Sequence, residues 1–214
     1  MDNSKKKISP YSAAITGCGF MYVEMGDLLP MLSSPDRDQI LRQEVKDGKV
    51  LKMKSEVTRD KAVLEFKRRY DAVPPAFWEW YQTLNDKSKR IAMFYVILKT
   101  YRICFDMQFN VVIPRWNSIE RSVTKNDILM EFNEIAAKDE FVDSWSEQTK
   151  DRISSACLSV LRKAGLLDEK TNILQSVDRS EIDFSYYISF GEIWLLEACL
   201  LKPYEIEQIK KMML

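Results

Sequence analysis

The sequence contains no histidine, and it has only six glycines and seven prolines among 214 residues. The missing imidazole removes the commonest general base and the commonest metal ligand of proteins. So few backbone breakers favour long helices over many short strands joined by tight turns. We therefore expect an all-α protein that is not a metal-, haem- or histidine-dependent enzyme.

Cysteine is also scarce, and no two cysteines stand close enough to form a CxxC pair. The four are isolated in apolar surroundings, at Cys18, Cys104, Cys157 and Cys199. This spacing disfavours a zinc site. We expect four free thiols in the core of a protein from a reducing cytosol, with no bound metal or cofactor.

The apolar runs are interrupted by charge. The most apolar stretch, residues 91–113, contains Lys99, Arg102 and Asp106, which predicts a buried helix and no membrane span. Lys5-Lys6-Lys7 is not followed by the apolar core of a secretion signal. We expect a cytoplasmic protein.

Charge is balanced over the whole chain but not along it. Residues 42–102 contain 15 Lys/Arg and 8 Asp/Glu, whereas residues 103–214 contain 13 and 19. A basic middle segment predicts a surface that faces a polyanion, and a solvated helix face without a partner is the alternative. The acidic residues form no recognisable catalytic pair, so we expect no enzyme activity.

Capping residues and apolar periodicity predict helices along most of the chain. Ser34, Asp86, Thr124 and Ser146 are the expected caps, and a small strand is expected only at 173–177. We expect two helical regions, residues 1–115 and 116–214, which can pack as one globule. The predicted helices cover residues 21–32, 35–47, 56–70, 76–84, 86 towards 114, 124–135, 146–164, 186–201 and 203–212.

One short pattern occurs twice, 91 residues apart. Residues 55–61 and 146–152 both have the form Ser-Glu-x-Thr-basic-Asp-basic, and both are expected to open a helix. Thr and basic side chains in a first turn, facing outward beside free backbone amides, are what a recognition helix offers to DNA. Good helix caps also resemble one another by chemistry alone, so two ordinary capped helices are the alternative.

The helix that follows the second copy has two distinct faces. Its apolar stripe, Ile153, Ala156, Cys157, Val160, Leu161 and Ala164, is predicted to face the core. Small, polar and basic side chains on the other face suit a DNA major groove. The ending 161–167 is similar to a winged-helix recognition helix that leads into its wing.

The helix of the first copy has a less regular stripe. Ala62, Phe66 and Tyr70 are its expected core residues, and Glu65 and Arg69 interrupt them. The candidate DNA-binding residues of the first unit are Lys52, Lys54, Ser55, Thr58, Arg59, Lys61, Lys67 and Arg68. Those of the second unit are Gln148, Thr149, Lys150, Arg152, Ser155 and Arg162.

Four stretches within about residues 11–170 match a known pattern. They are Thr16-Gly17…Glu24, Lys54-Ser55…Thr58 with Arg68-Arg69-Tyr70, Lys99-Thr100-Tyr101 to Phe105-Asp106, and Trp145-Ser146…Thr149 to Gly165-Leu166-Leu167. With these stretches the chain resembles the small A-type core protein family of bacteriophage exclusion (BREX) phage-defence systems. None of the matching residues is a catalytic signature.

The resemblance implies an all-α protein with two helix-turn-helix units that binds double-stranded DNA. It also implies a place beside methyltransferase and ATPase-type defence proteins. Part of that family resembles a small RNA-binding antitermination factor, so RNA remains open as a ligand, as does a role as a helical protein–protein adaptor. Two recognition units in one chain and the lack of a sustained heptad seam predict a monomer.

Overall fold

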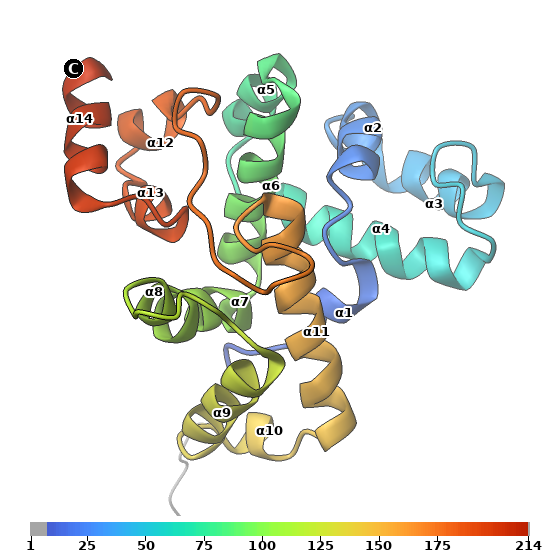
Figure 1. The fold of residues 1–214 in the computed structure, drawn as a ribbon. Helices are drawn as coiled ribbons and strands as arrows, with labels where there is room; N and C mark the ends of the chain where they lie inside the picture. Colours follow the sequence, from blue (N-terminus) through green and yellow to red (C-terminus); the bar gives the residue numbers. More distant parts are fainter. Residues whose placement is uncertain (1–7, 214) are drawn as a thin grey trace, which may run out of the picture.

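The computed structural model describes residues 8–213, and within them the expected all-α fold is confirmed. Extended pairing is limited there to two isolated bridges, Ser122 with Ile173 and Leu167 with Leu174. No helix in this range is both long enough and apolar enough to cross a membrane. The helices of Figure 1 are α1 Ile15–Cys18, α2 Tyr22–Leu32, α3 Arg37–Asp47, α4 Glu56–Asp71, α5 Pro75–Thr83, α6 Asp86–Thr100, α7 Arg102–Met107, the π-helix η1 Gln108–Val112, α8 Ile113–Trp116, α9 Lys125–Ala136, α10 Glu140–Asp143, α11 Glu147–Ala164, α12 Ser185–Ser189, α13 Trp194–Ala198 and α14 Pro203–Met213.

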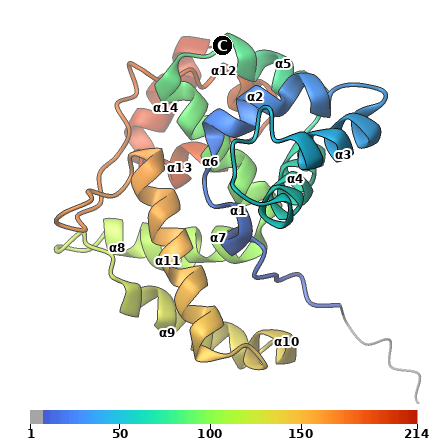
Figure 2. The ribbon, with the colours of Figure 1, turned by 90° about the vertical axis from the view of Figure 1, so that its right-hand side faces the viewer.

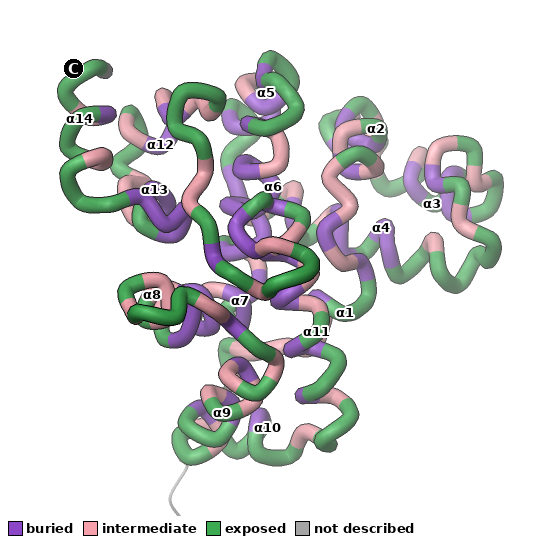
Figure 3. Tube along the Cα trace, in the orientation of Figure 1, coloured by how far each residue is buried: buried purple, intermediate pink, exposed green. Residues whose placement is uncertain are grey.

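Helix α6 lies at the centre of the molecule and is buried on all sides over residues 91–98. A helix that is apolar all round is stable only when other elements cover every face. Helices α2, α4, α7 and α11 all contact α6, and Figure 3 shows the buried positions gathered around it. The two predicted regions, residues 1–115 and 116–214, therefore contribute side chains to one continuous core.

The single helix expected from Asp86 towards Pro114 is wrong, because the chain breaks at Tyr101. The backbone of Tyr101 is extended, with φ −117° and ψ 101°, and α7 starts at the next residue. The chain continues through η1 into α8, where Pro114 stands in the first turn. A proline is tolerated there because its missing N–H would have no partner in the helix.

The C-terminal helix expected over 186–201 is also divided. Gly191 has φ 73° and separates α12 from α13. Helix α3 begins at Arg37, two residues later than expected, and Ser34 Oγ accepts a hydrogen bond from the Asp36 amide. Asn85, one residue before the expected Asp86, caps α6 through its side chain.

Other local predictions are confirmed. Ser55 and Ser146 cap α4 and α11, and Thr124 forms a capping box with Asp127. Gly165 ends α11 with φ 81°, a left-handed conformation that favours glycine. The four cysteines are free and buried.

Candidate nucleic-acid interface

The second candidate unit is built from α9, α10 and α11, backed by three short extended segments. Segment 172–175 lies in the middle: the Leu174 amide donates to Arg121 O at 2.7 Å, and the Gln175 amide donates to Leu166 O at 3.0 Å. The segment before α9 and the segment after α11 are therefore both hydrogen-bonded to residues 172–175. The two isolated bridges place a turn, residues 168–171, beside the C-terminal end of α11 (Figure 1).

That turn is held by one carboxylate. Asp168 Oδ1 accepts hydrogen bonds from the amides of Thr171 at 2.8 Å and Lys170 at 3.0 Å. The Thr171 amide and hydroxyl, with the Lys170 amide, lower the pKa of Asp168. Arg162 Nη2 donates to Asn172 Oδ1 at 2.7 Å, so this candidate residue connects α11 to the residue that directly follows the turn.

The two faces predicted for α11 are present. Ile153, Cys157 and Leu161 are buried, and Ala156 is half-buried. The opposite side exposes Gln148, Arg152 and Ser155 together with Glu147 and Asp151, so its charge is mixed. Asp151 forms an ion pair with Lys125 of α9 at 2.5 Å.

The first candidate unit is the α3–α4 pair, which forms an arm at the side of α6 (Figures 1 and 2). Arg59 holds its connector together. The guanidinium donates to three carbonyl oxygens: Val45 at 2.6 Å, Met53 at 2.7 Å and Lys46 at 2.9 Å. A Cβ at Gly48 would lie 3.1 Å from this guanidinium, so the close approach requires glycine. The expectation that Arg59 faces outward is therefore wrong.

A second buried group shapes the same connector. Glu44 is 3% exposed, and its Oε1 accepts the amides of Val50 and Leu51, both at 2.8 Å. Five exposed lysines surround this connector and the first turns of α4, and we call them the basic arm. They are Lys46, Lys49, Lys52, Lys54 and Lys61.

Sequence reasoning did not include Lys46 and Lys49 among the candidates. Lysines at 46, 49, 52 and 54 form a run, and this run was the available signal. Within residues 46–61 there are six Lys/Arg and three Asp/Glu. The arm is therefore locally basic even though Lys49 pairs with Asp47 at 3.0 Å.

The repeated Ser and Thr have the same local role in both copies. Ser55 Oγ accepts the Thr58 amide at 3.1 Å, and Ser146 Oγ accepts the Thr149 amide at 3.2 Å. Their hydroxyls lie within hydrogen-bond distance in each copy. Helix capping thus accounts for the Ser and Thr, two of the six defined positions of the repeated pattern.

Each copy of the pattern has two basic positions. The first of them forms the inner pair, Arg59 and Lys150, and the second forms the outer pair, Lys61 and Arg152. Arg59 is bound to carbonyls, and the matching Lys150 has a side chain only 11% exposed, 3.1 Å from Glu147 Oε1. The expectation that Lys150 faces outward is also wrong. The outer pair, Lys61 and Arg152, is exposed in both copies.

Two further candidates of the first unit have acidic partners. Lys67 Nζ lies 2.6 Å from Asp38 Oδ1, and Arg68 Nη1 lies 2.9 Å from Glu65 Oε1. Ser155 of the second unit donates its hydroxyl to Asp151 O at 3.0 Å. The candidates that remain exposed with a cationic or amide head are Lys52, Lys54, Lys61, Gln148 and Arg152.

The two units do not form one continuous patch. The first turn of α4 lies at the outer end of the arm, and the first turn of α11 lies at the base of the molecule in both views (Figures 1 and 2). Helix α1 lies between them and contacts both α4 and α11. Within residues 8–213, His, Cys, Asp and Glu side chains form no group that could hold a metal ion.

Comparison with known proteins identifies the fold and the family. The crystal structure of an uncharacterized protein from Magnetospirillum magneticum matches with a TM-score of 0.74 and 20% identity, over 89% of this chain and 98% of that chain. A likeness at this identity establishes a shared fold. No curated protein matches the chain. The BrxA family profile matches residues 9–179, and the chain therefore belongs to the BrxA family, which is associated with BREX phage defence.

Proposed function

We propose that this protein is a non-catalytic accessory protein of a BREX phage-defence system that binds double-stranded DNA in the cytoplasm. The observation that supports this most strongly is the basic arm. Its five lysines are exposed, while Arg59 and Glu44 hold the connector that presents them. Lysine heads on a rigid support neutralise phosphates without a large ordering cost.

The chemistry of the exposed candidates indicates what kind of DNA contact to expect. Lysines act as point charges towards phosphates, whereas base reading needs Arg, Asn or Gln placed in a groove. On α11, Gln148 and Arg152 are the exposed side chains of that second kind, beside Glu147 and Asp151. We expect binding that is driven mostly by the phosphate backbone, with weak sequence preference.

Duplex binding across a salt series tests this proposal. If about five phosphates are neutralised, log K should fall with log salt at a slope near −4 to −5. The triple variant Lys52→Gln, Lys54→Gln, Lys61→Gln should reduce the size of that slope by about 2–3. An affinity that does not change with salt would contradict duplex binding.

A control with the same change in net charge separates the arm from general electrostatics. Lys202 directly precedes α14, and Lys210 and Lys211 lie in its last turns; this helix is far from the arm in Figure 1. Replacing all three by Gln should leave the salt slope near the wild-type value. If this control and the arm variant lose equal affinity, overall charge governs binding and the arm is not the contact.

We also propose that the protein is a monomer without DNA, since each chain contains both candidate units. Light scattering should then give a mass near 25.1 kDa.

A further inference from the structure

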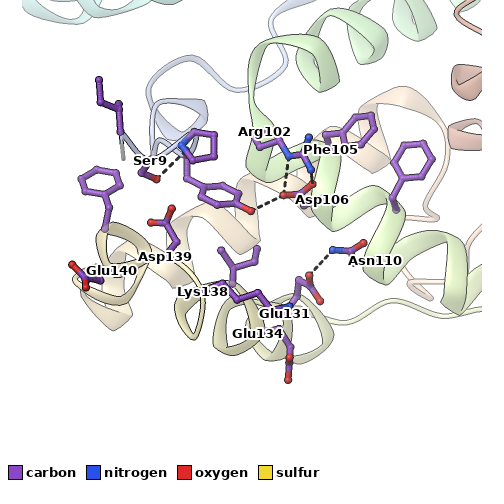
Figure 4. A pocket seen from close by; sticks show the side chains of 16 residues that line it. Ser9, Arg102, Phe105, Asp106, Asn110, Glu131, Glu134, Lys138, Asp139 and Glu140 are labelled. Atoms are coloured by element: carbon purple, nitrogen blue, oxygen red, sulfur yellow. Dashed lines mark hydrogen bonds and ion pairs between the residues drawn. The ribbon is translucent and has the colours of Figure 1, made fainter. Parts of the chain in front are cut away.

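A large groove lies on the side of α9 that faces α7 and η1. Residues 8–11 form one wall, α7 and η1 a second, and α9 with α10 the third (Figure 4). Its volume is about 1210 Å³, above the range of about 300–1,000 Å³ that is usual for small-molecule sites. This size suits a segment of polypeptide better than a small molecule.

Acidic side chains dominate the groove. Five carboxylates and two cations line it, and the cations are Arg102 and Lys138. The charge of Arg102 is balanced by Asp106, because Arg102 Nη2 lies 2.8 Å from Asp106 Oδ1. The acidic lining residues are Asp106, Glu131, Glu134, Asp139 and Glu140.

Asp106 is paired with Arg102, whereas Glu131, Glu134 and Glu140 form no ion pair within the described residues. Glu131 accepts a hydrogen bond from Asn110 at 2.7 Å, a neutral donor that leaves its charge in place. Within residues 8–213, Glu134 and Glu140 form no ion pair and accept no side-chain hydrogen bond. The groove therefore has a net negative charge that the described part of the chain does not neutralise.

Aromatic side chains also line the groove. The rings of Phe105 and Phe109 stack with centroids 4.5 Å apart, and both are half-buried. Phe141 is 51% exposed at the α10 side, and Ile135 is buried beneath. The aliphatic stems of lysine and arginine pack well on such rings while their heads reach carboxylates.

The wall formed by residues 8–11 is fixed to the rest of the groove through Tyr11. It has no helical structure, and Tyr11 donates its hydroxyl to the buried Asp106 at 2.8 Å. Burial and the bond to Asp106 raise the pKa of Tyr11 to about 12, so the hydroxyl remains a donor at neutral pH. Figure 4 shows Asp139 beside this segment, on the α10 side.

We propose that this groove is the docking site for an extended segment of a partner protein that is rich in lysine or arginine. Charge complementarity excludes a nucleic acid as the occupant and favours a cationic chain. The aromatic lining residues favour a segment in which cationic and apolar residues alternate, because an extended chain points them to opposite sides. The groove and the basic arm have opposite charge, so the two surfaces are suited to different partners at once.

Fluorescence anisotropy with a labelled eight-residue peptide of alternating arginine and leucine tests the proposal. A peptide of alternating glutamate and leucine serves as the reference. The full-length chain should bind the basic peptide and not the acidic one. The variant Glu131→Gln, Glu134→Gln, Glu140→Gln should bind about tenfold more weakly.

Two controls separate the groove from general surface charge. The variant Glu79→Gln, Glu120→Gln, Glu197→Gln removes three exposed carboxylates outside the groove and should bind like the wild type. Phe141→Ala keeps every charge and should still weaken binding, because it removes one aromatic side chain from the lining of the groove. Duplex DNA affinity should not fall in any of these variants, so failure of the DNA proposal would leave this test intact.

Three results would overturn the proposal. The first is equal peptide affinity in the groove variant and the control variant. The second is equal affinity for the basic and the acidic peptide. The third is peptide binding that arises only when Lys5, Lys6 and Lys7 are all replaced by Gln, which would assign the groove to this chain's own N-terminal residues.

Discussion

Arg69 donates from Nε to the hydroxyl of Tyr101 at 3.1 Å, and neither side chain is more than 1% exposed. The same hydroxyl donates to Glu65 Oε2 at 2.8 Å. Arg69 also donates to the carbonyl oxygens of Phe20, at 3.0 Å, and Gly19. One buried network thus connects α4, the turn before α2 and the break between α6 and α7.

Arg69→Met should lower the free energy of unfolding by about 3–5 kcal/mol, because it leaves the carbonyl oxygens of Phe20 and Gly19 without this donor and removes the positive charge from a buried network that contains Glu65. Tyr101→Phe removes one hydroxyl and should cost about 1–2 kcal/mol. Urea denaturation followed by circular dichroism measures both. Equal losses in the two variants would show that Arg69 is not the centre of the network.

Arg59 and Lys61 should respond differently to the same neutral substitution. Arg59→Gln loses hydrogen bonds to three carbonyls, so it should lower the melting temperature and also weaken DNA binding by loosening the connector. Lys61→Gln should weaken DNA binding with an unchanged melting temperature, since the head of Lys61 is exposed. Thermal melts and salt-series binding on both variants measure the difference. A fall in melting temperature for Lys61→Gln as large as that for Arg59→Gln would refute this division.

Cys157→Asp should unfold or aggregate the protein. Cys157 Sγ lies 3.8 Å from Cys104 Sγ in the core between α7 and α11, and an unpaired carboxylate buried there costs several kcal/mol. Cys157→Ala is the control and should keep a cooperative melt at a moderately lower temperature. A melt of Cys157→Asp near the wild-type temperature would mean that the faces of α11 are assigned incorrectly.

The turn at residues 168–171 should weaken in acid. Hydrogen bonds to its carboxylate place the folded-state pKa of Asp168 below the ordinary value of 3.8, so its contribution is complete above that value. The contribution is lost as the pH falls through the lower, folded-state pKa. Amide exchange of Lys170 and Thr171 should therefore rise, relative to their unfolded reference rates, as the pH falls below about 4.

Asp168→Asn should remove this pH dependence while leaving exchange in α6 unchanged. Thr171→Val, which removes one donor to the carboxylate, should reduce it only in part. A wild-type pH profile in Asp168→Asn would assign the acid sensitivity to another group.

Features determined within a few residues were predictable from the sequence. Ser55, Ser146 and Thr124 cap their helices through bonds to residues three positions away, and Gly165 ends α11 through its own backbone freedom. The apolar stripe of α11 was predictable because 3.6-residue periodicity already sorts side chains into two faces. For the same reason the chain could be assigned to an all-α class before any contact was known.

Contacts between distant parts of the chain decided the rest. Tyr101, where the long helix breaks, is hydrogen-bonded to Arg69, 32 residues earlier, and Arg59 turns inward to the carbonyls at the end of α3. Helix propensity reflects only neighbouring residues and does not include such long-range contacts. The sequence pattern therefore predicted one long helix from Asp86 and an outward-facing Arg59. The groove is the clearest case, because segments near residues 8, 105 and 135 form it together. Its charged and aromatic lining exists only once tertiary packing brings those three segments side by side.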